Sequence, residues 1–144
     1  MGLVYQEYQV GRCQLKTLFT RIIEGEIPCH FIHKDDEFFS FLDIRPIRQG
    51  HALVVPKNQN DYIFDQPESV LSRMLLFAKE VAGAIEKEVN CERIGLSVLG
   101  LEVPHTHLHL VPISEAQMIN FGDAREANQG ELSALAEKIR SHLN

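Results

Sequence analysis

A single long amphipathic helix over residues 67–89 is the element that most constrains the fold of this chain. Its apolar residues recur at steps of three and four, which is the period of a helix with one buried face. These positions are Val70, Leu71, Met74, Leu75, Ala78, Val81, Ala82, Ile85 and Val89. Pro67 suits the first turn, where no backbone N–H is needed. An apolar helix face has to pack against a second layer, which the rest of the chain must supply.

Short apolar runs on both sides of this helix predict the strands of that layer. They cover residues 29–33, 37–42, 51–56, 93–99 and 105–113, and turn residues such as Asp35, Pro46 and Gly50 stand between them. A short helix is predicted over 17–25, with Thr17 as its N-cap, and a C-terminal helix over 131–143. The pattern predicts an α+β fold with a mainly antiparallel five-stranded sheet.

The chain is predicted to form one domain over residues 1–144. It contains 144 residues, which is the size of a typical single domain, and it has no internal repeat or Pro/Gly/Ser-rich linker. Residues 1–16 show no clear period and are expected to form a loose N-terminal arm. Residues 114–144 are expected to form a tail that ends in the C-terminal helix.

Composition argues against several classes of function. The net charge of −6 disfavours nucleic acid as a partner, because phosphate backbones require a basic surface. No segment approaches the roughly 20 apolar residues that span a membrane, and the N-terminus lacks the layout of a signal peptide. The three cysteines, Cys13, Cys29 and Cys91, show no paired spacing. We therefore expect no disulfide framework and a cytoplasmic location.

Three histidines within five residues predict a chemical site. His105, His107 and His109 alternate with Thr106, Leu108 and Leu110. On a strand, alternate residues point to the same face, so we expect the three imidazoles to share one face. A stable fold has no need for three neighbouring imidazoles that can each gain charge near neutral pH.

The residues by themselves leave two chemistries open. One is a metal site, because neutral imidazoles bind zinc and iron, with His51, Asp43 or Glu102 as the additional ligand. The other is nucleophilic catalysis, in which one histidine attacks an electrophile while its neighbours fix its tautomer and stabilise charge.

The residues 105–111 (HTHLHLV) resemble the motif of the histidine triad family, in which three histidines alternate with apolar residues. Residues 19–28 (FTRIIEGEIP) resemble the opening helix of that family, and residues 41–44 with 50–57 resemble its nucleoside-binding loop and second strand pair. The resemblance is greatest to the Hint-like branch of nucleoside phosphoramidases. It implies a HIT-like fold, a homodimer and a small purine nucleotide as the partner, without a cofactor.

The resemblance also implies a role for each histidine. His107 would attack the α-phosphorus of a purine nucleotide conjugate and form a nucleotidyl-histidine that water hydrolyses. His109 would contact the phosphoryl oxygens and His105 would orient the nucleophile, with His51 hydrogen-bonded to His105. The conjugates would be nucleoside phosphoramidates, acyl adenylates or dinucleoside polyphosphates.

The substrate-binding residues follow from the same resemblance. Asp43 would accept hydrogen bonds from the ribose hydroxyls, as a carboxylate does well. An apolar slot for the base would be formed by Phe19, Ile22, Phe41 and Ile44. The loop before the triad would face the phosphate with Leu99, Gly100, Glu102 and Val103.

The chain departs from the family at two places. Many members bind a structural zinc through cysteines and a histidine where this chain has Thr17, Thr20 and Gln59, so we expect no metal here. The phosphate loop carries Leu101 and Glu102 in place of polar neutral residues. Arg45 and Arg48 are candidate replacements on a neighbouring loop. An alternative function is therefore a non-catalytic or weakly catalytic purine-nucleotide-binding module.

Overall fold

The computed structural model describes residues 15–143, so nearly all of the predicted N-terminal arm lies outside the described residues. The α-helices are α2 (Leu18–Ile23), α3 (Glu68–Glu88) and α4 (Gln129–Arg140). The strands are β1 (His30–Lys34), β2 (Phe38–Leu42), β3 (Ala52–Pro56), β4 (Arg93–Ser97) and β5 (Leu108–Ile113). Two short 3-10 helices are η1 (Ile63–Asp65) and η2 (Phe121–Asp123).

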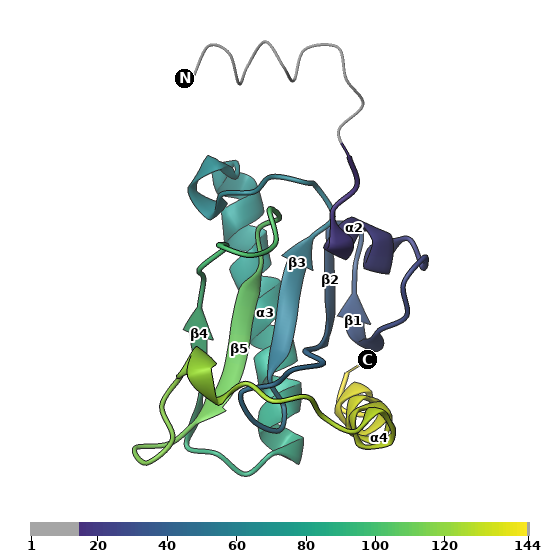
Figure 1. The fold of residues 1–144 in the computed structure, drawn as a ribbon. Coiled ribbons are helices and arrows are strands. Elements are labelled where there is room, and N and C mark those ends of the chain that lie inside the picture. Colours follow the sequence, from purple (N-terminus) through teal and green to yellow (C-terminus); the bar gives the residue numbers. More distant parts are fainter. Residues whose placement is uncertain (1–14, 144) are drawn as a thin grey trace.

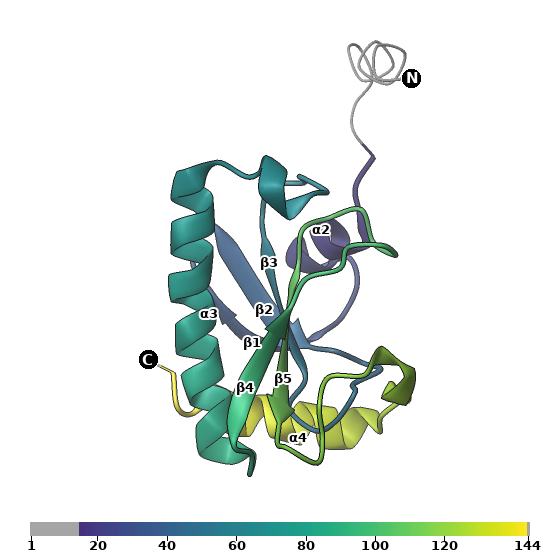
Figure 2. The ribbon, with the colours of Figure 1, turned by 90° about the vertical axis from the view of Figure 1, so that its left-hand side faces the viewer.

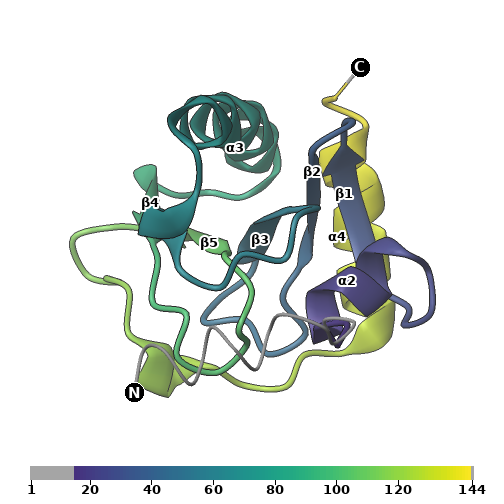
Figure 3. The same cartoon turned by 90° about the horizontal axis from the view of Figure 1, so that it is seen from above.

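The five strands form one antiparallel sheet in the order β1-β2-β3-β5-β4 (Figure 1). This architecture confirms the predicted α+β fold with its long central helix. The helix α3 lies along one face of the sheet (Figure 2), and α4 joins it there. The short helix α2 packs against the opposite face (Figure 3). The sheet is therefore a middle layer between helices.

The central strands β2 and β3 are buried on both faces. Phe38 and Leu42 point into the core that contains α3, whereas Phe39 and Phe41 point into the core beneath α2. Every residue of β2 is buried. Burial on two faces explains why the phenylalanines of this strand follow one another without strict polar alternation.

The strand predicted over 105–113 begins later than expected, at Leu108. Residues 105 and 106 instead make loop hydrogen bonds, from the His105 amide to the Val103 carbonyl and from the Thr106 amide to the Asn60 carbonyl. Because these partners are not in a strand, His105 does not continue the alternation that His107 and His109 follow. The C-terminal helix also differs, since Asn128 caps it and it starts at Gln129.

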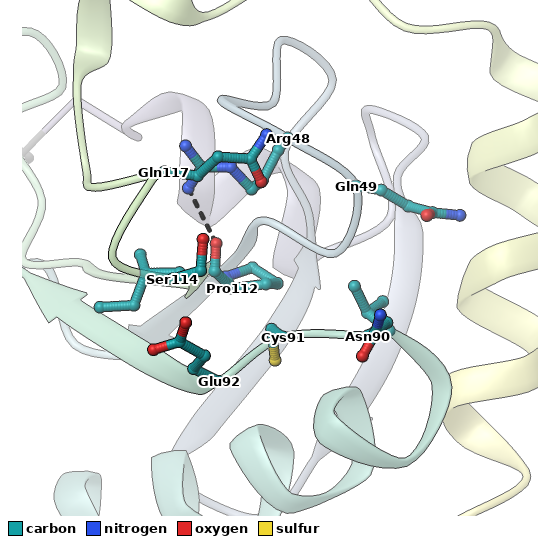
Figure 4. Close-up of a pocket in the computed structure, with 10 residues that line it drawn as sticks. Arg48, Gln49, Asn90, Cys91, Glu92, Pro112, Ser114 and Gln117 are labelled. Atoms are coloured by element: carbon teal, nitrogen blue, oxygen red, sulfur yellow. Dashed lines mark hydrogen bonds between the residues drawn. The ribbon is translucent and has the colours of Figure 1, made fainter.

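A segment after β5 folds back over the sheet, and we call residues 114–128 the C-terminal strap. The Arg48 guanidinium fastens it to β5 by donating to the carbonyls of Pro112 and Met118, at 2.8 and 3.0 Å. Figure 4 shows Arg48 beside a hollow of about 470 Å³ at this end of the sheet. Further along, the amides of Arg125 and Ala127 donate to the carbonyls of Pro46 and Ile44.

None of the helices within residues 15–143 has the length and apolar character that a bilayer crossing requires.

Candidate active site

A cavity of about 730 Å³ opens between α2, the ends of β2 and β3, the β4–β5 loop and the C-terminal strap. It gathers all nine residues that the sequence predicted to bind substrate, together with three of the four predicted catalytic histidines. The nine are Phe19, Ile22, Phe41, Asp43, Ile44, Leu99, Gly100, Glu102 and Val103. A volume of this size falls in the usual range of small-molecule sites.

One end of the cavity is an apolar slot. Phe19 and Ile22 come from α2 and Phe41 from β2, and all three are buried. The rings of Phe19 and Phe41 meet edge to face with centroids 5.7 Å apart. Ile44 is 54% exposed and stands at the rim. A slot with aromatic and aliphatic walls is suited to a flat apolar group such as a nucleobase.

Asp43 lies between this slot and the histidines. Its Oδ1 accepts the backbone N–H of Arg45 at 2.9 Å, and its Oδ2 is 3.6 Å from His51 Nε2. Burial raises the pKa of the Asp43 carboxyl, and the carboxylate of Glu102 acts in the same direction. Asp43 therefore places a carboxyl group in a cavity that is otherwise lined mainly by apolar residues.

His51 and His109 form a hydrogen-bonded pair. The Ile47 amide donates to His51 Nδ1 at 3.0 Å, which places the His51 proton on Nε2. That Nε2–H donates to His109 Nδ1 at 2.9 Å, so the proton of His109 is on its own Nε2. The partner that the sequence predicted for His51 was His105, and this prediction is wrong. The register between β3 and β5 explains the difference. Leu53 of β3 pairs with His109, and this pairing brings His51 beside His109.

Burial keeps these rings neutral. It lowers the pKa of His51 to about 3, with His109 and Arg48 adding to the effect. It also lowers the pKa of His109 to about 4, with a further contribution from His107. Each ring therefore carries one proton at neutral pH, and its hydrogen-bond partners decide which nitrogen holds it.

His107 presents a lone pair to the cavity. Its Nδ1 lies 2.7 Å from the His105 carbonyl oxygen, which can only accept, so Nδ1 carries the proton of the neutral ring. The lone pair is then on Nε2. The ring contacts Phe19 at 5.0 Å between centroids and His109 also at 5.0 Å. A nucleophilic nitrogen and a hydrogen-bond donor thus stand side by side.

His105 does not share the cavity with the other three histidines. It is fully buried, and its Nε2 donates to the Pro56 carbonyl at 2.7 Å. Its Nδ1 is 2.6 Å from the Thr17 hydroxyl. The expectation that the three imidazoles share one face therefore fails at His105. It fails because this residue precedes β5 and turns beneath α2.

The β4–β5 loop supplies the rim on the side of His107. Gly100 adopts a positive φ of 72°, a conformation that side chains rarely adopt. Leu101 is 90% exposed, and Glu102 is also exposed. An exposed carboxylate is screened by water, so the repulsion of Glu102 on an anionic group is weaker than the sequence position suggested.

The C-terminal strap adds cavity residues that sequence reasoning missed. Phe121 packs edge to face on His109 with centroids 4.8 Å apart, and Arg125 also lines the cavity. The one signal in the sequence that could have indicated this contact is a single phenylalanine, Phe121, within a polar loop. The guanidinium of Arg48, in contrast, donates to the carbonyls of Pro112 and Met118. Arg48 is therefore a structural residue and not a phosphate ligand. Arg45 lines the cavity as expected.

Asp43, His51 and His109 also form a cluster that could hold a metal ion, since their ligand atoms lie within 4.8 Å of one another. The tautomer of His51 works against this use. Its Nδ1 accepts the Ile47 amide, so Nε2, the atom that faces the cluster, carries a proton and has no lone pair for a metal. Elsewhere, Thr17, Thr20 and Gln59 are joined by hydrogen bonds and offer no thiolate, which is the group zinc prefers.

The comparisons with known proteins agree with this geometry. The HIT domain matches residues 24–116. The adenosine 5′-monophosphoramidase HNT1 of Candida albicans is 32% identical over 137 residues, covering 88% of this chain and 90% of that protein. The adenylylsulfatase HINT3 of Arabidopsis thaliana is 29% identical over 147 residues, covering 92% of this chain and 75% of that protein.

Solved structures give the same result. A crystal structure of a Hit-like protein involved in cell-cycle regulation, from Bartonella henselae, matches with a TM-score of 0.79 and 26% identity. The match covers 92% of this chain and 99% of that one. With its fold, its cavity of histidines and its matching relatives, the chain belongs to the HIT domain family.

Proposed function

We propose that this protein cleaves the bond between the α-phosphorus of a purine nucleotide conjugate and its leaving group, through a nucleotidyl intermediate on His107. The observation that carries the proposal is the tautomer of His107, whose Nδ1–H is held by the His105 carbonyl so that Nε2 is free to attack. The relatives named adenosine 5′-monophosphoramidase and adenylylsulfatase support the same class of substrate.

The first step forms the intermediate. His107 Nε2 forms a bond to the α-phosphorus while the bond from phosphorus to the leaving nitrogen or oxygen breaks and takes its electron pair. The Nε2–H of His109, fixed by His51, donates to a phosphoryl oxygen and stabilises its charge. A leaving amine takes its proton from solvent, which reaches the open side of the cavity.

The second step regenerates the enzyme. A water molecule bonds to phosphorus, the bond to Nε2 breaks, and its electron pair returns to the imidazole. The water gives up one proton, which balances the proton consumed in the first step. Because the Nδ1–H stays on the ring, His107 leaves phosphorus as a neutral imidazole, which is a good leaving group.

A binding module without catalysis is the second candidate, since the β4–β5 loop carries Leu101 and Glu102. Two measurements on the purified chain separate the candidates, namely calorimetry with AMP and hydrolysis of an adenosine 5′-phosphoramidate. Binding together with multiple turnovers supports the enzyme. Binding without turnover favours the module, and activity that is lost on chelation and restored by zinc would point to the metal site instead.

Replacing Asp43 by Asn is expected to raise KM for an adenosine conjugate about tenfold or more, with a smaller change in kcat. A hydrogen bond to a charged acceptor is worth about 1.5–3 kcal/mol, and the ribose would lose one. Steady-state kinetics with ribose and 2′-deoxyribose conjugates measure this. Asp123→Asn is the matched control, because Asp123 is exposed and does not line the cavity. An equal loss in both variants, or no preference of the wild type for ribose, would contradict the role of Asp43.

We also propose that the chain forms a homodimer through the β4 edge. β4 is the outer strand of the sheet, and its Leu96 is 47% exposed, while α3 exposes Leu75 and Leu76. Unpaired strand edges and large exposed apolar side chains favour association. Sedimentation should give twice the chain mass, and Leu96→Lys should shift it toward the monomer. Leu15→Lys, at an exposed leucine that belongs to neither β4 nor α3, should leave the dimer intact, and a monomeric wild type would refute the proposal.

We place the protein in the cytoplasm as part of the same proposal. Cys29 and Cys91 are free thiols, and Cys29 lines the cavity beside the apolar slot. Reduced cysteines persist in a reducing compartment. Fractionation of cells that express the protein tests the location.

A further inference from the structure

The segment that carries the His107 nucleophile lies outside the strand and is held by loop backbone and side-chain hydrogen bonds. β5 begins only at Leu108, one residue after His107. Thr106 is anchored to the loop before α3, because its hydroxyl donates to the Asn60 carbonyl at 2.8 Å and accepts from Gln66 at 3.2 Å. The position of the His105 carbonyl, which orients His107, therefore depends on how residue 105 is held.

The ring of His105 provides that hold. Its Nε2–H donates to the Pro56 carbonyl, so Nδ1 has the lone pair and accepts the Thr17 hydroxyl at 2.6 Å. The ring is fully buried and neutral, since burial lowers its pKa. Both nitrogens are thus used, one by the end of β3 and the other by the start of α2.

Thr17 itself is fixed from two further directions. Its backbone N–H donates to Gln59 Oε1 at 2.7 Å, and its hydroxyl oxygen accepts the Thr20 amide at 3.1 Å as the N-cap of α2. Thr17 does not line the cavity. Two residues later, Phe19 packs on the rings of both His105 and His107. The first turn of α2 is therefore connected to the nucleophile by a hydrogen bond and by ring packing.

We propose that Thr17 is a positioning residue for His107. The Pro56 carbonyl sets the tautomer of the His105 ring, and the Thr17 hydroxyl, by donating to Nδ1, fixes the orientation of that ring and through it the carbonyl that keeps the His107 proton on Nδ1. Without the hydroxyl, the buried His105 Nδ1 lacks a donor, which is costly in a site that excludes water. The ring then reorients and the hold on the His107 tautomer weakens. This inference rests on the proposed nucleophilic role of His107.

Thr17→Val removes the hydroxyl at nearly constant volume and is expected to lower kcat about tenfold, the effect of losing one hydrogen bond to a positioned group. The dissociation constant for AMP should stay within about twofold, because Thr17 does not contact the cavity. Thr17→Ser should restore kcat. Thr20→Val is the comparison variant on the same helix. The Thr20 hydroxyl lies 3.2 Å from that of Thr17 but makes no hydrogen bond to His105, so its loss should lower kcat less than the loss of the Thr17 hydroxyl.

Nitrogen-15 NMR of the histidine rings gives a readout that does not need activity. The wild type should show His105 protonated on Nε2 and His107 on Nδ1. Thr17→Val should shift the Nδ1 resonance of His105, which loses its donor, and the tautomer population of His107. Thr17→Gly repeats the measurement with a tolerated N-cap if the valine variant fails to fold. Wild-type kcat and unchanged ring tautomers in Thr17→Val would overturn the proposal, as would an equal loss in Thr20→Val. A wild type without turnover would count against the proposed function alone, because the NMR shifts still test Thr17.

Discussion

Replacing His107 by Asn is expected to lower the turnover of an adenosine 5′-phosphoramidate by about a thousandfold or more. Loss of a catalytic nucleophile has effects of this order or larger, because the covalent route through His107 is then closed. Asparagine keeps a polar side chain of similar length, so AMP binding should change only a few fold. Chromatographic detection of released AMP measures the turnover, and mass spectrometry after a base quench detects the nucleotidyl adduct in the wild type.

The control for this variant is His30→Asn. His30 belongs to β1 and bonds to Gln129 Oε1 at 2.6 Å, outside the cavity, so its replacement should leave turnover unchanged. The adduct should be absent from the His107 variant and present in the His30 variant. If His107→Asn retains turnover within tenfold of the wild type, or if the adduct maps to another residue, the proposed mechanism is wrong.

Replacing Gly50 by Ala is expected to lower the free energy of unfolding by about 2–5 kcal/mol. Gly50 has a φ of 92°, and a Cβ there would lie 2.9 Å from Val89 Cγ2 and 3.0 Å from Pro112 Cγ. The positive φ costs about 1–2 kcal/mol for a residue with a side chain, and crowding in a packed core adds about 1–3 kcal/mol. Urea denaturation followed by circular dichroism measures the change.

Gly25→Ala separates the two contributions to this loss. Gly25 also has a positive φ, of 82°, but a Cβ there meets nothing within 4 Å. Its replacement should therefore cost only the backbone part. If both alanine variants lose the same stability, crowding does not contribute at Gly50. The loop would then lie farther from α3 and β5 than the structure places it. The comparison also concerns the site, because Gly50 precedes His51 and sets where its ring enters the cavity.

Local patterns were sufficient for the elements, and the resemblance to the histidine triad family was sufficient to choose residues that line the cavity. The helix predicted over 67–89 is α3 over 68–88, since a period of three and four residues is a property of the helix itself. The nine predicted binding residues were assigned from the family's motifs, and they line one cavity. Strand ends were less predictable, as β5 shows, because a strand ends where its partners end and these partners are distant in sequence.

The pairing of the histidines could not be predicted from the chain alone. Alternation places His105, His107 and His109 on one face only if residues 105–109 form a strand, and residue 105 is instead tied to Thr17 and the Pro56 carbonyl. The register of β3 against β5 brings His51 to His109 and not to His105. Likewise, Phe121 reaches His109 from the strap, which Arg48 and the amides of Arg125 and Ala127 hold in place.

The sequence by itself therefore determined the fold class, the apolar slot, the acceptor Asp43 and the group of histidines in which the chemistry is proposed to occur. The fold class depends on residue types and short-range periods, whereas the slot, Asp43 and the roles of the histidines came from the resemblance of their motifs to the histidine triad family. Both are present in the chain before it folds. The tertiary structure alone decided which nitrogen of each histidine carries its proton, because that depends on carbonyls, amides and hydroxyls supplied by α2, β3 and the loops. Such contacts join residues up to 88 positions apart, so no local pattern contains them.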